Sequence, residues 1–487
     1  MSAMRLEHFL CYSDTSSVDE HAADYRRLGF VPQAHAARWE PGLRNRFIGL
    51  WPEYLELVWV EDEAAFAASD DPIKRYRASR RPFGVGILTD DLPALHDEWV
   101  ARGFELPPVT HESPAGSDQA AGPMFVFQAI PHHLLPGVDA FGLTSYHRPA
   151  PPIRRQVWVA PNSVFGLAGV TLVSHTPAAD ADAWRRLLAP NETAREVPGG
   201  SDLVVGPHRL TWLTPDAHAA RHGLTWDRSG DGADAMALFE LLAGDPERLE
   251  RYAAAADRPT RRLADGALLL EPSAHDGFRF VVRGGDVDEW AGWRDERLGL
   301  HHEVVRIDEF MARGTPGTGE YVVRSATVDD LPAIRRLGEE VLPETYAAIA
   351  PDSYIAMLLE RYWSDAANAA AIASPTEELL VAESPFSGVL GVAHTAPYAA
   401  DSVILWRLYL VPRSRRLGVG TALLDDCIRR CAPQVSTFLT EYLAGNRAAA
   451  AFYEAHGFAE VREERNPWEA TEVRVIYASR QVPADPT

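Results

Sequence analysis

The sequence has few cysteines and few cations for its length. Three cysteines in 487 residues cannot form a disulfide framework, and the four-residue spacing of Cys427 and Cys431 is typical of one helix. Lys and Arg number 47 against 69 Asp and Glu, which gives a net charge of −22. This charge argues against nucleic acid and anionic membranes as partners. A cationic or neutral small molecule is the easier partner, although the charge also keeps a chain of this kind soluble.

Long apolar runs are also missing. No segment approaches the roughly 20 unbroken apolar residues that a bilayer crossing needs, and the first residues, MSAMRLEHFLCYS, do not read as a secretion signal. We therefore expect a cytoplasmic protein. A chain of 487 residues exceeds one ordinary core and predicts several domains.

The first 285 residues contain an internal repeat. In each of four segments an apolar strand is followed by an amphipathic helix and then by two or three strands. The opening strands begin near Leu6, Phe83, Leu167 and Ala235. The helices are expected over Val18–Leu28, Leu92–Ala101, Ala181–Leu188 and Pro246–Ala255.

These βαβββ units resemble the vicinal oxygen chelate superfamily, in which two units form one half-open barrel. The first pair looks closest to the glyoxalase-like branch, through LEHFLCYS, GLRNRFIGL and YLELV. The resemblance implies two such domains, at 1–148 and 149–285, the second of them degenerate. The Pro-rich stretch His147–Arg155 would connect them.

In metal-using members of this superfamily, a His on the first strand and a Glu on the last strand of a unit bind a divalent ion. His8 and Glu56 match these positions. The second unit offers no such pair, and a catalytic site usually needs three protein ligands. His132, His133 or His147 could complete the set. The third and fourth units have poorer candidates, so a metal in the second barrel is not expected, and Glu271 reads as a surface carboxylate.

After an acidic stretch and the Gly-rich hexapeptide GTPGTG, together the predicted linker 286–320, the last third has a different pattern. Three strands lead into RRLGVG, Arg415 to Gly420, which stands between a strand ending at Val411 and a helix over Thr421–Cys431. A Gly-rich turn at a helix start can bring backbone N–H groups to a pyrophosphate. The alternative is an ordinary helix start with two glycines.

A second motif follows in LTEYLAGNRAAAAFYEAHGF, Leu439 to Phe458. It combines a strand, a loop with Asn446 and a helix that bears Tyr453. Together with R-x-x-G-x-G, this order of elements resembles the GNAT family of N-acetyltransferases over about 160 residues. The predicted fold is therefore an α+β and α/β multidomain chain: two paired βαβββ half-barrels, then a GNAT mixed sheet flanked by helices at 321–480, and a disordered tail at 481–487.

The resemblance implies acetyl-CoA as the cofactor. The coenzyme would lie in a V-shaped opening between the strands Val403–Val411 and Val435–Leu443. The residues that would contact it are Leu408, Tyr409, Leu410, Arg415, Arg416, Leu417, Gly418, Val419, Gly420, Thr421 and Asn446. Tyr453 would protonate the coenzyme's sulfur during direct transfer to an amine.

Direct transfer also needs a base, because amines are mostly protonated at neutral pH. Glu441, five residues before Asn446, is the best candidate, at a position where several family members carry a Glu used as base; it could also be a solvated strand residue. Glu383 and His394 are weaker candidates. Trp406 or Arg407 would line the acceptor side, and strand alternation makes the other a packing residue. The aromatic and acidic segment Glu344–Ser374 suits an amine with an apolar body.

Three interpretations of the half-barrels stay open. They bind the small-molecule amine that the transferase acetylates, as in resistance, detoxification or secondary metabolism, with Trp51, Trp59 and Trp212 as candidate lining residues. Alternatively, the first is a metal-dependent lyase or dioxygenase-like enzyme, or both are a scaffold that forms a homodimer. An independent role for nucleic acid or membrane is not expected.

Overall fold

The computed structural model describes residues 4–13, 18–32, 42–69, 74, 77, 81–112, 125–140, 143–146, 155–226, 235–272, 275–317, 321–385, 387–431, 435–465 and 473–482. The chain divides into two compact units, Met1–Asp308 and Glu309–Thr487. No helix among the described residues is long and apolar enough to span a bilayer.

The first unit contains the predicted repeat. Its first two segments are β1 (Arg5–Tyr12), α1 (Val18–Arg27), β2 (Val31–Pro32), β3 (Leu43–Leu50) and β4 (Glu53–Val60), then β5 (Gly84–Leu88), α3 (Leu92–Ala101), β6 (Thr110–Glu112), β7 (Phe125–Phe127) and β8 (Leu143–Tyr146). A short helix, α2 (Glu63–Ala68), separates them. The described strands form one sheet in the order β2-β3-β4-β1-β5-β8-β7-β6.

The next two segments repeat this order. They are β10 (Val164–Val173), α4 (Pro177–Leu188), β11 (Arg195–Val197), β12 (Gly200–Val205) and β13 (His208–Leu213), then β14 (Met236–Ala243), α6 (Pro246–Ala255), β15 (Thr260–Arg262), β16 (Leu268–Leu270) and β17 (Phe280–Gly284). A short helix, α5 (Pro215–His222), separates these two. The sheet order is β11-β12-β13-β10-β14-β17-β16-β15, the same topology as in the first sheet. The closing of each sheet into a half-barrel stays a prediction.

The two sheets share one hydrophobic core. All eight residues of β1 are buried, as expected for a strand covered on both faces. Phe9 of β1 meets Phe239 of β14 edge to face, with ring centroids 5.0 Å apart. The indole Nε1 of Trp99 in α3 donates to the carbonyl of Leu187 in α4 at 3.0 Å. These contacts explain why Met1–Asp308 folds as one unit.

The end of this unit packs back on both sheets. β18 (Glu303–Arg306), which follows α7 (Val287–Leu298), pairs in parallel with β9 (Gln156–Val159). Arg294 of α7 is fully buried and forms an ion pair with Glu53 at 2.7 Å, and His208 lies 3.2 Å from the same carboxylate. Much of the predicted linker 286–320 therefore packs on the first unit.

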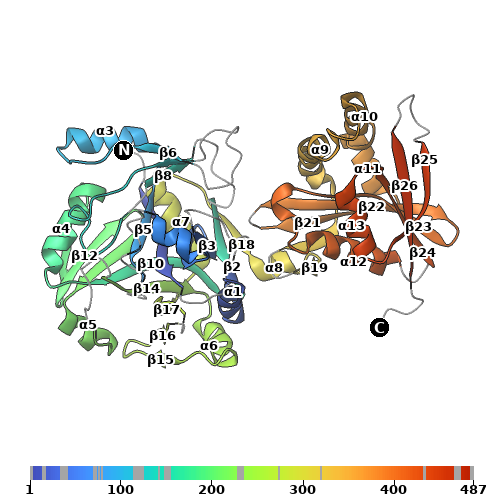
Figure 1. Ribbon diagram of the computed structural model, residues 1–487. Helices are drawn as coiled ribbons and strands as arrows, with labels where there is room; N and C mark the ends of the chain where they lie inside the picture. Colours follow the sequence, from blue (N-terminus) through green and yellow to red (C-terminus); the bar gives the residue numbers. More distant parts are fainter. Residues whose placement is uncertain are drawn as a thin grey trace. The chain divides into compact units, whose positions relative to one another are not determined.

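The second unit is an eight-stranded sheet, as far as its residues are described, in the order β19-β20-β21-β22-β23-β24-β26-β25 (Figure 1). Its strands are β19 (Thr315–Pro316), β20 (Val322–Ser325), β21 (Glu378–Ser384), β22 (Gly388–Ala399), β23 (Ser402–Leu410), β24 (Thr437–Leu443), β25 (Ala459–Arg465) and β26 (Arg474–Gln481). Its helices are α8 (Ile307–Met311), which begins in the first unit, α9 (Leu331–Tyr346), α10 (Asp352–Tyr362), α11 (Asp365–Ala373), α12 (Val419–Cys431) and α13 (Arg447–Ala455), with single 3-10 turns at Val328–Asp330 and Pro412–Ser414.

Helices cover both faces of this sheet. Tyr409 of β23 bonds to Tyr346 of α9, whereas a Cβ on Gly420 of α12 would lie 3.2 Å from Leu410. Consecutive strand residues point to opposite faces, so α9 and α12 lie on opposite sides of β23. Thr315 and Pro316, part of the Gly-rich hexapeptide, form the edge strand β19, and 483–487 of the expected tail lie outside the described residues.

Candidate acetyl-transfer site

The strands β23 and β24 pair over only part of their length. Their parallel ladder joins Ser402–Leu405 to Thr437–Thr440 among the described residues, yet β23 continues to Leu410 and β24 to Leu443. At the last pair, the buried Thr440 hydroxyl donates to the Leu405 carbonyl at 3.3 Å. Beyond it, the backbone edge of β23 is available to an extended ligand, because N–H and C=O groups need partners. The ladder therefore ends where the sequence places the V-shaped opening, and the use of this place by a cofactor stays a prediction.

The RRLGVG segment forms an unusual turn before α12. Arg416 has φ +65° and Gly418 has φ +80°, and a positive φ is uncommon for a residue other than glycine. Turns of this kind bring successive N–H groups together into an anion-binding concavity. The first N–H groups of α12 add to it, since they have no partners within the helix.

The two glycines serve different purposes. A Cβ on Gly418 would meet only the Tyr321 hydroxyl, at 3.9 Å, so Gly418 is required by its backbone angle and leaves the turn open. A Cβ on Gly420 would lie 3.2 Å from Leu410 and 3.3 Å from Phe452. Gly420 therefore allows α12 to pack closely against β23 and α13. From the sequence, the approach of a pyrophosphate to the backbone was instead the expected reason for both glycines.

The polar side chains around this turn already have protein partners. Arg415 forms a bidentate ion pair with Glu344 of α9, at 2.8 and 3.1 Å, on the surface. The Thr421 hydroxyl lies 3.0 Å from Nε2 of His456, whose Nδ1 lies 2.7 Å from the Phe452 carbonyl. Asn446 is the N-cap of α13, and its Oδ1 accepts from the amide of Ala449 at 3.1 Å. The backbone amides of the turn, not these side chains, are thus the main groups open to an anion.

Tyr453 lies in a nearly closed aromatic environment. The residue is 6% exposed, and its ring stacks on Tyr442 at 5.8 Å and meets Phe458 edge to face at 5.4 Å between ring centroids. Burial raises the pKa of the Tyr453 hydroxyl well above its usual value, although a hydrogen bond with Thr440 opposes the shift. Tyr453 therefore contacts the residue at which β23 and β24 separate, and it keeps its proton. This position and the retained proton are what a proton donor needs.

Glu441 is the residue after Thr440 and pairs across the ladder with Tyr477. Burial raises the pKa of its carboxyl above 4.5, while a hydrogen bond from Tyr477 and the charge of Arg462 oppose the shift. A carboxylate with a raised pKa is a better proton acceptor. Glu441 thus combines position and electrostatics suited to a base.

The other candidate bases are engaged elsewhere. Glu383 forms an ion pair with Arg324 at 2.7 Å. Burial, followed by the charge of Arg407, lowers the pKa of His394 to about 3, and its Nε2 lies 2.8 Å from Glu377. Arg407 is buried and donates to Asn368 at 2.7 Å, whereas Trp406 is 38% exposed. Arg407 is therefore the packing residue of that pair.

The sequence did not suggest the Tyr409 side chain as a candidate functional group. Tyr409 was expected to contribute its backbone, but its hydroxyl lies 2.6 Å from the Tyr346 hydroxyl and its ring meets Trp363 edge to face at 5.2 Å. Burial raises the pKa of Tyr409, and the nearby Glu441 charge adds to the shift. Consecutive strand residues point to opposite faces of the sheet, so the Tyr409 side chain points away from the side of Leu408 and Leu410. This alternation was the signal in the sequence that could have identified it.

His8 and Glu56 lie close together, as predicted, but their side chains already contact other protein groups. Their Nε2 and Oε2 atoms lie 3.7 Å apart, and Asn45 donates to Oε1 of Glu56 at 2.5 Å. The His8 ring stacks on Tyr54 at 4.9 Å, and a Cβ on Gly86 would overlap it at 1.9 Å. Burial raises the pKa of Glu56 and lowers that of His8, while their mutual attraction opposes both shifts.

The described residues provide no group of three metal-binding side chains, and His147 lies outside them. Two ligands, one of them bonded to an amide, do not fit a catalytic metal centre. Glu271, the carboxylate noted in the fourth repeat, binds Arg279 at 3.1 Å.

Comparisons with known proteins agree with this division. The glyoxalase-like domain family matches residues 6–188, and the acetyltransferase (GNAT) domain family matches residues 375–460. The chain thus carries a glyoxalase-like domain and a GNAT acetyltransferase domain. No curated protein matches it.

Among solved structures, the chain is similar to a PaiA N-acetyltransferase from Thermoplasma acidophilum in complex with coenzyme A (19% identity, 32% of this chain, 97% of that chain, TM-score 0.28). It is also similar to the ribosomal-protein-S18-alanine N-acetyltransferase from Escherichia coli (23% identity, 33% of this chain, 94% of that chain, TM-score 0.27). A chimeric spermidine N-acetyltransferase from Vibrio cholerae is a further example (18% identity, 33% of this chain, 95% of that chain, TM-score 0.27).

Proposed function

We propose that the second unit transfers an acetyl group from acetyl-CoA to an amine of a small molecule by direct attack. The observation that carries this proposal is the early end of the ladder between β23 and β24, with the Arg416–Gly418 turn before α12 in the same unit. An extended, phosphate-bearing cofactor needs both an open strand edge and an anion site. The match of residues 375–460 to the acetyltransferase domain family supports the same reaction class.

The residues present fit acetyl-CoA. The open edge of β23 at Leu408–Leu410 would pair with the amide groups of the pantetheine arm. The amides from Arg416 to Thr421 would hold the pyrophosphate. Asn446 would contact the cofactor with its amide nitrogen, because Oδ1 already caps α13. Bound acetyl-CoA would supply an acetyl thioester.

The proton transfers are assigned to two side chains of this chain. A carboxylate oxygen of Glu441 takes a proton from the acceptor ammonium and so frees the nitrogen lone pair. As the new N–C bond forms and the C–S bond breaks, the Tyr453 hydroxyl gives its proton to the departing sulfur. The acylated nitrogen then loses its second proton to solvent, and the Tyr453 oxygen regains a proton from solvent. Burial raises the basicity of Glu441. Burial also keeps Tyr453 protonated, so its hydroxyl holds a proton to give, although the raised pKa makes it a weaker acid than an ordinary tyrosine.

The acceptor would approach beside Tyr409 and Tyr346, whose hydroxyls are bonded to each other. Trp363 packs on Tyr409, so the wall is aromatic with polar edges. Such a wall fits an amine that has an apolar body. An activity assay with a panel of amines would identify the acceptor.

A test of cofactor binding uses two matched glycines. Gly418 and Gly388 both have positive φ, +80° and +65°, and added Cβ atoms would have space at both positions. We expect Gly418→Val to weaken binding of acetyl-CoA to the full chain at least tenfold, because a β-branched residue disfavours this angle and the turn would change shape. Gly388→Val, in the β21–β22 turn, strains the backbone in the same way but should leave binding unchanged. Release of free thiol, measured with an amine panel, reports the transfer itself. Equal binding by both variants would contradict the proposed anion site.

A further inference from the structure

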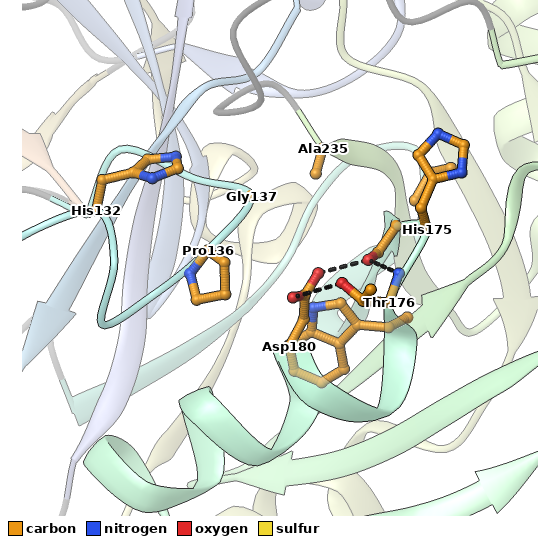
Figure 2. A pocket seen from close by; sticks show the side chains of 10 residues that line it. His132, Pro136, Gly137, His175, Thr176, Asp180 and Ala235 are labelled. Carbon is orange, nitrogen blue, oxygen red and sulfur yellow. Dashed lines mark hydrogen bonds between the residues drawn. The ribbon is translucent and has the colours of Figure 1, made fainter.

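The first unit contains a cavity of about 190 Å³ at the start of α4. One wall carries Asp180, Ser174 and Thr176, and apolar groups from Val173 and Ala235 also line it. Figure 2 shows Asp180 and Thr176 on one side and the loop with His132, Pro136 and Gly137 facing them. The volume is below the roughly 300 Å³ at which drug-sized pockets begin. It therefore admits only a small molecule.

The cavity has a carboxylate without a cation. Asp180 accepts hydrogen bonds from the hydroxyls of Ser174 at 2.5 Å and Thr176 at 3.2 Å (Figure 2), and it forms no ion pair within the described part of the chain. Hydroxyl donors satisfy lone pairs but do not neutralise charge. In this partly enclosed space, an ammonium group would interact with Asp180 more strongly than it would in water.

The cavity also has buried polar atoms without hydrogen-bond partners among the described residues. Trp212, which lines it, is fully buried, and its indole Nε1 has no hydrogen-bond partner among the described residues. Nε2 of His132, another lining residue, is buried and lacks a partner in the same set. The neighbouring Trp184, in contrast, donates its Nε1 to the Pro136 carbonyl at 3.1 Å. A buried indole N–H usually has a partner, so a ligand oxygen is the natural complement.

We propose that this cavity binds a small ammonium compound that also carries a hydroxyl or carbonyl oxygen. The ammonium group lies against Asp180, the oxygen accepts from Trp212, and the carbon skeleton contacts Val173 and Ala235. The site lies outside the acetyl-transfer machinery. The proposal rests on the proposed function only for the choice of an amine ligand, and it makes the glyoxalase-like region a binding module.

The test measures binding to the full chain by calorimetry, without acetyl-CoA. The probes are ethanolamine and D-glucosamine, with ethylene glycol and D-glucose as neutral counterparts. We expect saturable heat from at least one amine and none from its counterpart. Asp180→Asn keeps the size of the side chain and should lower affinity at least tenfold. Trp212→Phe keeps the ring against Trp184, whose centroid is 5.6 Å away, and should lower affinity about threefold.

Asp182→Asn is the matched control, because Asp182 lies on the same helix, has a half-exposed side chain and pairs with Arg185. It should bind as the unchanged chain does. Three results would overturn the proposal. Neither amine gives saturable heat, which is the result expected for a cavity that holds only water; the neutral counterparts bind as tightly as the amines; or Asp180→Asn binds the amines as the unchanged chain does. Should Trp212→Phe fail to fold, as circular dichroism would show, Asp180→Asn decides. Thiol release is measured separately, so binding without acetyl transfer would refute only the proposed function.

Discussion

The His8–Glu56 region and the β23–β24 opening both bring predicted functional residues together, but they differ in what is left for a ligand. In the first, Glu56 is 7% exposed and already bonded to Asn45, and His8 is stacked between Tyr54 and the position of Gly86. In the second, strand pairing stops at Leu405 and the helix start presents open amides. A ligand site needs unmet bonding capacity as well as the right residue types.

The comparison also concerns charge. Glu56 and Glu441 both have a pKa raised by burial. Glu56 faces a histidine and an amide within a packed sheet, whereas Glu441 stands one residue beyond the separation of two strands. The same shift accompanies a packed contact in one place, and in the other it accompanies the role of base that we propose for Glu441.

The largest expected effect comes from Tyr453→Phe. Removal of this hydroxyl should lower kcat about 10² to 10⁴-fold, the usual range for a lost general acid, and should leave binding of acetyl-CoA nearly unchanged. Thiol release under saturating substrates measures it. Tyr442→Phe is the matched control, since Tyr442 stacks on Tyr453 but donates its hydroxyl to Glu460 at 2.8 Å. Equal activity of the two variants would remove Tyr453 from the mechanism.

A smaller effect, about 10²-fold in kcat, is expected for Glu441→Gln. The raised pKa of Glu441 means that its carboxyl holds a proton to a higher pH than an ordinary glutamate does. Activity of the unchanged chain should rise with pH through this raised pKa, as the base loses its proton. The rise should disappear in Glu441→Gln. A pH profile of kcat that keeps the same acidic limb in this variant would assign the base elsewhere.

The smallest effect on chemistry is expected for His8→Ala. This change should leave acetyl transfer unaltered, remove no bound metal, and cost about 1–3 kcal/mol of folding stability through lost packing. Metal analysis and denaturant unfolding of the full chain measure these outcomes, with His301→Ala, whose side chain is 93% exposed, as the control. Stoichiometric metal that depends on His8 would instead make the two regions alike.

Much of the fold was predictable from the sequence. Apolar periodicity gave the four repeat segments, and the helices over Leu92–Ala101 and Pro246–Ala255 have the expected bounds. The helix α4 begins at Pro177, earlier than the predicted Ala181, because Pro is favoured in a first turn where its missing N–H costs nothing. The shared core of the two sheets was not foreseen, since Phe9 and Phe239 are 230 positions apart and periodicity carries no information on such pairs.

For the site, the sequence by itself determined the residue types and their local order: the Gly-rich turn between a strand and a helix, and Glu441, Asn446 and Tyr453 on the next strand and helix. Spacing within one strand–turn–helix is a local property, so it can be read along the chain. Only the tertiary structure decided which polar groups have partners. Arg407 packs against Asn368 and His394, and the close approach of Phe452 leaves little room for a side chain at position 420. The indole N–H of Trp212, which lines the same cavity as Asp180, has no acceptor among the described residues. Each of these depends on contacts between distant segments, and whether a polar group is satisfied or open is a property of the folded core.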